Sequence, residues 1–306
     1  MSDAANHQLR QQQVARLMRR AAIASVSVSL FLVLIKTFAY FASHSVALLA
    51  SLADSALDLF TSSLNLFAIR QALTPADDEH RFGHGKAEPL AGLAQGAFIA
   101  ASALFLVIQA VNRIISPEPI DHSVPALLVM CVAILCAIGL ILYERGVVRK
   151  TGSVAIEADQ THYLGDLVTN IGVVLAIVLT TYMDWPLADP VIAIAVAGIM
   201  VFTAWGVARG ALDQLMDREL PDHDRARIAT IVRGHGAVRS LHDLKTRQAG
   251  LSTFIQVHLE MDPAMTLAEA HAISDEVERD LMTAFPGADV IIHQDPAGLE
   301  MVMPVA

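Results

Sequence analysis

Two pairs of ionisable residues lie four positions apart inside long apolar stretches of the sequence. Asp54 and Asp58 interrupt one stretch, and His162 and Asp166 interrupt another. Residues at i and i+4 share one face of a helix, so each pair converges on one point. An ionisable side chain at the centre of a bilayer costs roughly 2.5 to 3.5 kcal/mol and usually marks an ion pathway. Three carboxylates and one imidazole suit a tetrahedral divalent ion such as zinc, so the sequence predicts a metal site inside a membrane.

The same acids also have a simpler interpretation, in which they pair with Lys36 or line a water cavity. Lys36 supplies one positive charge against several acids, whereas a divalent ion neutralises two carboxylates at once. Metal binding is therefore the favoured hypothesis. Asp166 either ligates the ion or orients the imidazole of His162. Because a histidine ordinarily titrates near neutral pH, a proton at His162 can replace the metal, which is a physical route to antiport.

The elements that carry these residues are expected to be membrane helices. Of the 306 residues, 54% are hydrophobic and 17% are charged, and the mean hydropathy is +0.50. This composition is too apolar for an ordinary soluble domain. Six apolar segments come close to or exceed the roughly 20 residues that span a bilayer. They lie at about 21–42, 46–69, 88–115, 124–143, 154–181 and 187–211.

Positive residues flank alternate segments, which predicts the orientation of the chain because such flanks stay cytoplasmic. The first arm and the loops after the second and fourth segments carry Arg10, Arg16, Arg19, Arg20, Arg70, Arg81, Lys86, Arg145, Arg149 and Lys150. The opposite loops, at 41–45, 116–123 and 182–186, contain none. Both termini are therefore predicted to be cytoplasmic. The expected division is a cytoplasmic arm at 1–20, a six-helix transport domain at 21–211 and a cytoplasmic metal-binding dimerisation domain at 212–306.

The composition changes after the last apolar segment. From Asp213 onward, sixteen acidic residues face eight basic ones, so this tail carries most of the formal charge of −10. An acidic surface disfavours nucleic acid as a partner and concentrates cations. The periodicities predict helix, strand, strand, helix and strand, in a small two-layer α+β domain. These elements are expected at 222–233, 240–247, 253–261, from Thr266 onward, and at 290–293.

Two further groups of histidines have metal-ligand chemistry but an equally ordinary alternative. Asp77, His80 and His84 form either an exposed ion site or a solvated polar loop. In the tail, His258 falls on the strand face opposite the apolar side chains, and His293 closes the last strand. Imidazoles from neighbouring strands therefore form either a metal cluster or separate solvated groups. His223 and His235 lie beside predicted helix ends and are expected to be surface residues.

Four strings of the sequence, taken in order, resemble one transporter family. They are LASLADSALDL at 49–59, HRFGHGKAEPLAGLAQ at 80–95, THYLGD at 161–166 and VIIHQDP at 290–296. Together with the predicted topology they resemble the cation diffusion facilitator family of divalent-metal transporters. The similarity is to bacterial members of the zinc and ferrous-iron efflux pump type, and it runs nearly from end to end.

The resemblance implies a homodimer of six-helix protomers with a metallochaperone-like cytoplasmic domain. It implies a transport site of Asp54, Asp58, His162 and Asp166 and a loop site of Asp77, His80 and His84. It also implies a cytoplasmic binuclear site of His242, His258, His271, His293, Gln294 and Asp295. A structural salt bridge near the membrane surface would fall on Lys86 and Asp217.

The function expected from these observations is a secondary transporter rather than an enzyme. It would export a divalent transition metal, zinc first, in exchange for protons across a bacterial inner membrane. Iron, cadmium and manganese stay open as cargo, because availability and geometry outweigh intrinsic affinity. No organic cofactor is implied, and the partners are metal ions, protons, membrane lipid and a second copy of the chain. An intramembrane metalloprotease is disfavoured because the chain contains no HExxH motif, and a sensor without flux would not need the intramembrane acids.

Overall fold

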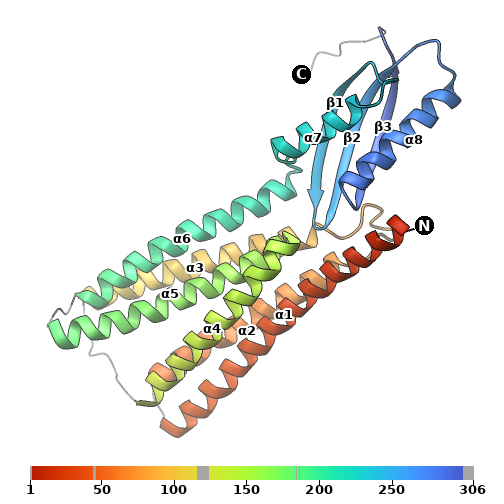
Figure 1. The fold of residues 1–306 in the computed structure, drawn as a ribbon. Helices are drawn as coiled ribbons and strands as arrows, with labels where there is room; N and C mark the ends of the chain where they lie inside the picture. The colour runs from red at the N-terminus through yellow and green to blue at the C-terminus, as the bar shows by residue number, and fades with distance from the viewer. Residues whose placement is uncertain (1, 44–45, 116–123, 184, 186, 299–306) are drawn as a thin grey trace. The chain divides into compact units, whose positions relative to one another are not determined.

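Six long helices form the first two thirds of the chain (Figure 1). The computed structural model describes all residues except 1, 44–45, 116–123, 184, 186 and 299–306. The predicted loop at 116–123, and parts of those at 41–45 and 182–186, lie outside the described residues. The helices are α1 (Ser2–Ser43), α2 (Val46–Ala72), α3 (Ala87–Ile115), α4 (Val124–Thr151), α5 (Val154–Met183) and α6 (Ala188–Leu215).

Four of these helices are long and apolar enough to cross a membrane. Within the described residues, the qualifying segments are Gln12–Phe41, Ala87–Ile115, Leu128–Thr151 and Ala188–Leu215. The other two helices, α2 and α5, have 27 and 30 residues and carry the ionisable pairs. At about 1.5 Å per residue, both exceed the roughly 30 Å of a hydrocarbon core. The fold class is therefore membrane α-helical, and the two helices outside this set of four are the ones with the candidate ligands.

Arg81 and Lys86 lie in the loop between α2 and α3 as expected, but the other positive residues expected in the loops after the second and fourth segments lie in helix ends, which corrects the sequence interpretation. Arg70 belongs to the last turn of α2, and Arg149 and Lys150 belong to the last turn of α4. The helix α4 ends at Thr151, eight residues beyond the predicted apolar segment, and is followed by Gly152 at φ 66°. Lys and Arg are good helix formers, so an apolar span continues into its charged flank until a residue favours the left-handed conformation.

The polar stripes of the helices meet inside the bundle. Ser25 on α1 donates a hydrogen bond to Ser62 on α2 at 2.9 Å. Ser29 on α1 shares a 2.6 Å hydrogen bond with the Tyr163 hydroxyl on α5. Asn65 on α2 donates to the carbonyl of Ala155 on α5 at 3.2 Å. Because a buried polar group needs a partner, these bonds fix which faces of α1, α2 and α5 point inward.

The C-terminal unit begins at Asp213 and has the predicted order of elements (Figure 1). Its elements are α7 (Asp222–Arg233), β1 (Ser240–Ala249), β2 (Ser252–Met261), α8 (Leu267–Ala284) and β3 (Ala288–Pro296). The sheet order is β1-β2-β3, with β1 antiparallel and β3 parallel to β2. The parallel pair requires a crossover connection, which α8 supplies.

One face of this sheet is covered by the two helices. Ile255, Val257 and Leu259 on β2 are fully buried and pack with Val232 on α7 and Val277 on α8. Since side chains alternate along a strand, His258 and Glu260 must lie on the opposite face of β2. The apolar core therefore sets which face of the sheet is available for polar chemistry.

A capping box at the start of α8 leads to a stability prediction. The Thr266 side chain accepts a hydrogen bond from the Glu269 amide, and the Glu269 carboxylate accepts one from the Thr266 amide. Replacing Thr266 by alanine should destabilise this end by about 1 kcal/mol, because the Glu269 amide loses its acceptor. Amide exchange in the first turn should rise about fivefold, which hydrogen–deuterium exchange of the full chain would measure.

A threonine in the last turn of α8 supplies the control for this prediction. Among the described residues, the Thr283 hydroxyl donates only to the carbonyl of Arg279 one turn earlier, and Thr283→Ala should leave exchange at the first turn unchanged. Equal exchange rates in the Thr266 variant and the native chain would contradict the capping role.

Candidate metal centres

The helices α2 and α5 bring three candidate ligands together within the bundle. Single ligand atoms of Asp58, His162 and Asp166 lie within 4.8 Å of one another. Nε2 of His162 is 3.1 Å from Oδ1 of Asp58 and 3.7 Å from Oδ2 of Asp166. His162 is buried, whereas the two carboxylates are partly accessible. One imidazole nitrogen and two carboxylate oxygens therefore point at one small volume.

Asp54, the fourth expected ligand, is not part of this group. It lies one turn before Asp58 and is exposed, and it does not belong to the 4.8 Å group formed by the described side chains. Four residues of helix rise about 6 Å along the axis, so two carboxylates at this spacing need opposite inclinations to reach one ion. Its role as a ligand stays a prediction.

Lys36 on α1 is buried, but the structure does not pair it with these acids. Its ammonium group donates to the Ser55 hydroxyl at 2.6 Å and to the Ser51 carbonyl at 3.1 Å. Among the described residues, no carboxylate lies within ion-pair distance of it. The alternative in which Lys36 neutralises Asp54 or Asp58 by direct contact is therefore not what the structure contains.

Sequence reasoning missed a buried acid on α4. Glu144 is fully buried in the bundle, and Asp159 on α5 is 1% exposed. Gln95 on α3 donates to Oδ1 of Asp159 at 3.5 Å. Glu144 follows the predicted apolar segment at 124–143 by one residue, so the predicted span does not include it. Continuing the helical periodicity by one turn would have placed it on the buried stripe of Ala137 and Leu140.

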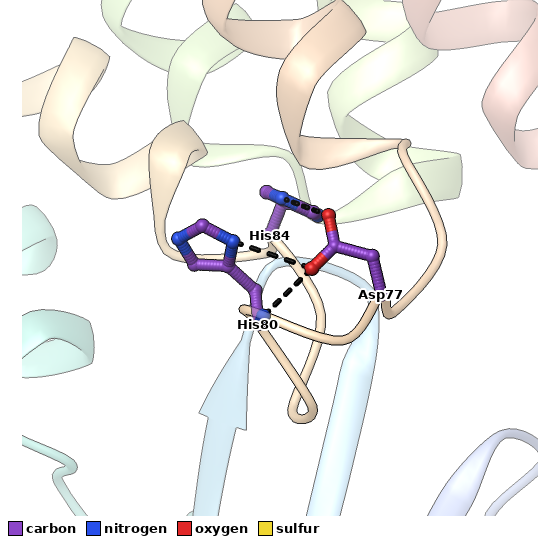
Figure 2. Close-up of side chains that lie close together, drawn as sticks. All are labelled: Asp77, His80 and His84. Carbon is purple, nitrogen blue, oxygen red and sulfur yellow. Dashed lines mark hydrogen bonds and ion pairs between the residues drawn. The ribbon is translucent and has the colours of Figure 1, made fainter.

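The loop between α2 and α3 folds around the carboxylate of Asp77, as Figure 2 shows. Nδ1 of His80 lies 3.4 Å from one carboxylate oxygen, and Nε2 of His84 lies 3.3 Å from the other. The backbone amides of His80 and Glu79 also donate to Asp77, at 2.7 and 3.0 Å. Three ligand atoms, one from each of the expected residues, lie within 4.8 Å of one another.

The backbone hydrogen bonds also set the charge of Asp77. The amide of His80, and then that of Glu79, lowers the pKa of the Asp77 carboxyl below its ordinary value. A lowered pKa means that the carboxylate stays ionised, and the turn stays stabilised, at neutral pH and is lost only as the medium becomes strongly acidic. An anion held by backbone amides between two imidazoles is a ready acceptor for a cation.

In the C-terminal unit, the strand register aligns three histidines in one row. His242 on β1 pairs with His258 on β2, and His258 pairs with His293 on β3. Ring centroids of neighbouring imidazoles are 5.1 and 4.5 Å apart. Direct strand neighbours on one face stand about 4.5 to 5.5 Å apart, so the alignment follows from sheet geometry.

The carboxylate of Asp295 lies at the centre of this row. It is 2.8 Å from Nδ1 of His258, 3.3 Å from Nε2 of His242 and 3.2 Å from Nε2 of His293. Ligand atoms of His242, His258 and Asp295 lie within 4.8 Å of one another. Two imidazoles and a carboxylate are a usual zinc-type ligand set with room for a further ligand.

Two other residues of the expected binuclear site lie elsewhere in this chain. His271 is on α8, exposed, and 3.7 Å from Asp275 one turn later. Gln294 alternates to the helix-covered face of β3, where it donates to the Ser274 hydroxyl at 2.8 Å. The sheet therefore separates Gln294 from His293 and Asp295, its neighbours in sequence. Their participation in metal binding stays a prediction.

The remaining predicted contacts have different outcomes. Lys86 and Asp217 belong to different units, whose relative placement is not determined, so their salt bridge stays a prediction. His223 is exposed as expected. His235 is not a simple surface residue, because only 16% of its side chain is exposed and Nε2 lies 3.1 Å from Asp280 on α8. A sequence does not indicate this contact, since it depends on how α7 packs on α8.

The chain combines apolar helices that enclose one group of candidate ligands with a small acidic α+β unit that carries a second group. These features define an integral membrane protein with candidate metal sites. Comparison with known families agrees with this class. Residues 22–216 match the cation efflux transmembrane domain, and residues 220–297 match the cytoplasmic domain of cation efflux proteins. The chain belongs to the cation efflux family, also called the cation diffusion facilitator family.

Curated relatives cover nearly the whole chain. The cation-efflux pump FieF of Escherichia fergusonii is 44% identical over 288 residues, which are 94% of this chain and 96% of that protein. The pump of the same name from Klebsiella pneumoniae is 43% identical over the same shares. A solved structure of CzrB in its zinc form is 38% identical, covers 28% of this chain and 97% of that one, and has a TM-score of 0.26.

Proposed function

We propose that this cation efflux protein is a proton-coupled antiporter that exports a divalent transition metal, zinc first, from the cytoplasm. The observation that carries the proposal is the group of Asp58, His162 and Asp166 between α2 and α5. These helices are flanked by membrane spans, and an ionisable group at such a depth is costly unless a cation neutralises it. The metal is the substrate of this site, and the Asp54 side chain would complete the ligand set.

Proton exchange is assigned to the same group. Nε2 of His162 lies 3.1 Å from the Asp58 carboxylate. When this nitrogen is protonated, it would donate a hydrogen bond to the same carboxylate oxygen that would otherwise ligate the metal. Metal and proton compete for one nitrogen lone pair, because an imidazole must be deprotonated there to ligate. Protons arriving from outside would release the metal, and metal arriving from the cytoplasm would release the protons.

The direct test is metal flux in sealed proteoliposomes with and without a pH gradient. Purified protein should exchange zinc for protons across the vesicle membrane. The rate of zinc flux should exceed that of iron, manganese or cadmium under equal conditions. Dissipating the gradient with a protonophore should stop net accumulation while leaving passive exchange. Zinc flux that is indifferent to the pH gradient would overturn antiport, and the lack of flux for any of the four metals would overturn the transport assignment.

The loop group of Asp77, His80 and His84 is proposed as a second, more exposed metal site. Asp77→Ala should remove this site entirely, because both imidazoles and two backbone amides converge on its carboxylate. Calorimetric titration with zinc should then show one site fewer per chain than the native protein. Asp78→Ala is the matched control, because this neighbouring side chain is exposed and pairs only with Arg81 within the described loop. An unchanged number of sites in the Asp77 variant would refute the loop assignment.

The group on the sheet is proposed to bind regulatory zinc. Its donors fit zinc, since two imidazole nitrogens and one carboxylate oxygen lie within 4.8 Å. The C-terminal units of two chains would pair in a homodimer, and metal binding would stabilise one arrangement of the membrane helices. Such regulation needs a different metal affinity in two states, which flux measured against cytoplasmic zinc concentration would reveal.

The proposed location is the bacterial inner membrane, with lipid around the helices and both termini in the cytoplasm. The support is the predicted distribution of Lys and Arg, which gathers at alternate helix ends. Labelling of a cysteine introduced at Ser2 in right-side-out vesicles tests the orientation. Protection from an impermeant reagent is expected, and rapid labelling would reverse the proposed topology.

A further inference from the structure

Glu260 has a position in the sheet that the proposed metal ligands do not explain. The register aligns Ser240, Glu260 and Asp295 in one row, which is separated from the row of three histidines by the row of Leu241, Leu259 and Gln294. Alternation along β2 places Glu260 on the same face as His258, two residues away. Only 16% of its side chain is exposed. The polar face of the sheet therefore carries a second largely buried carboxylate next to Asp295.

The ion-pair partner of this carboxylate is a ring nitrogen rather than a lysine or arginine. Oε1 of Glu260 lies 3.6 Å from Nδ1 of His242, and among the described side chains no other cation lies within 4 Å of it. A buried carboxylate without a strong cationic partner is costly. A functional interaction between the Glu260 carboxylate and the imidazole of His242 would explain why an acid lies at this position.

His242 has one nitrogen for the metal and one for Glu260. Nε2 lies 3.3 Å from Asp295 and belongs to the proposed ligand group, whereas Nδ1 is buried and has no hydrogen bond to any described residue. A neutral imidazole carries its proton on only one nitrogen. If Nε2 ligates a metal, the proton must be on Nδ1, where it needs an acceptor.

We propose that Glu260 is a positioning residue that accepts the Nδ1 proton of His242 and thereby turns Nε2 toward the metal. A movement of about 0.6 Å brings the 3.6 Å contact into hydrogen-bond range. Metal-ligating histidines generally donate their other N–H to a carboxylate or carbonyl, which fixes the tautomer and raises ligand basicity. This inference rests on the proposed metal binding at the sheet and names a residue that determines its affinity.

The test uses the full chain in detergent, with Asp58→Ala and Asp77→Ala as a common background so that the sheet group is the remaining proposed site. Zinc affinity is measured by competition with a chromophoric chelator. Glu260→Ala should weaken zinc binding about 10- to 100-fold, and Glu260→Gln, which keeps a neutral acceptor, should weaken it less. Asp289→Asn is the matched control, since this exposed acid lies on the same face of β3, six residues before Asp295.

A spectroscopic measurement distinguishes positioning from loss of structure. The absorption spectrum of bound cobalt should keep its shape in Glu260→Gln at saturating metal, because the ligand set is the same. The nitrogen-15 spectrum of the zinc-loaded background protein should show His242 protonated at Nδ1, and this signal should broaden or exchange tautomer in Glu260→Ala.

The possible failures are separable. If the background protein binds no zinc, the proposed sheet site is wrong and the role of Glu260 falls with it. If the background protein binds zinc and Glu260→Ala binds it with equal affinity, the positioning role alone is overturned. A cobalt spectrum that changes shape in Glu260→Gln would also overturn it, because Glu260 would then be a ligand.

Discussion

Zinc flux through proteoliposomes should fall to the level of empty liposomes when Asp58 is replaced by alanine. The substitution removes the carboxylate on α2 that lies 3.1 Å from Nε2 of His162, so that only the two residues on α5 remain of the group of three. Even if Asp54 completes the set, three ligands are left for an ion that takes four in a tetrahedral site. We expect a loss of more than about 100-fold, larger than the 10- to 100-fold typical of residues that only support a ligand.

The control for this variant is an acid on the same helix as His162. Glu157 is exposed in the first turn of α5, and Glu157→Gln should leave zinc flux close to native. Zinc binding at the sheet should also persist in Asp58→Ala, which shows that the protein is folded. Native flux in Asp58→Ala would remove the transport assignment from this group of residues.

The second large effect is expected at Asp295, whose carboxylate lies within 3.3 Å of three imidazoles. Asp295→Ala should abolish zinc binding by the sheet, because no other described carboxylate is shared by His242, His258 and His293. A ligand at 100 times its dissociation constant stabilises the protein that binds it by about 2.7 kcal/mol. Zinc should therefore raise the unfolding temperature of the native C-terminal unit and leave that of the variant unchanged.

Thermal unfolding of the full chain in detergent, followed by the far-ultraviolet signal of the sheet, would measure this difference. Asp289→Asn should respond to zinc like the native chain, since this residue is exposed and remote from the histidine row. Equal zinc stabilisation of Asp295→Ala and the native chain would contradict metal binding at this face.

The order of elements was predictable because each element has its own local pattern. Apolar runs long enough to cross a bilayer predicted the helices, and strict alternation at Ile255, Val257 and Leu259 predicted β2 and its buried face. The ends were less predictable. Helix α4 continues through its charged flank to Thr151, and β3 runs from Ala288 to Pro296 rather than only over 290–293. Helix and strand propensities change only gradually along the sequence near the end of an element. Hydrogen bonds to neighbouring residues or strands then extend the element beyond its predicted end.

The ligand groups were predictable only where their spacing is local. His162 and Asp166 share a helical face through the i, i+4 relation, and the loop of Asp77, His80 and His84 spans eight residues. The pairing of His242, His258 and His293 needs the register of three strands, and the sequence left it open. Glu144 escaped notice because its burial depends on neighbouring helices.

By itself, the sequence determined the class of protein, the number and order of its elements, and which residue types carry metal chemistry. These depend on composition and on periods of two and 3.6 residues, which are properties of a single chain segment. Only the tertiary structure decided that Asp54 lies outside the ligand group of α2 and α5, that Gln294 faces α8, and that Glu260 faces His242. Each of these depends on distances between segments far apart in the chain, and such distances are set by packing.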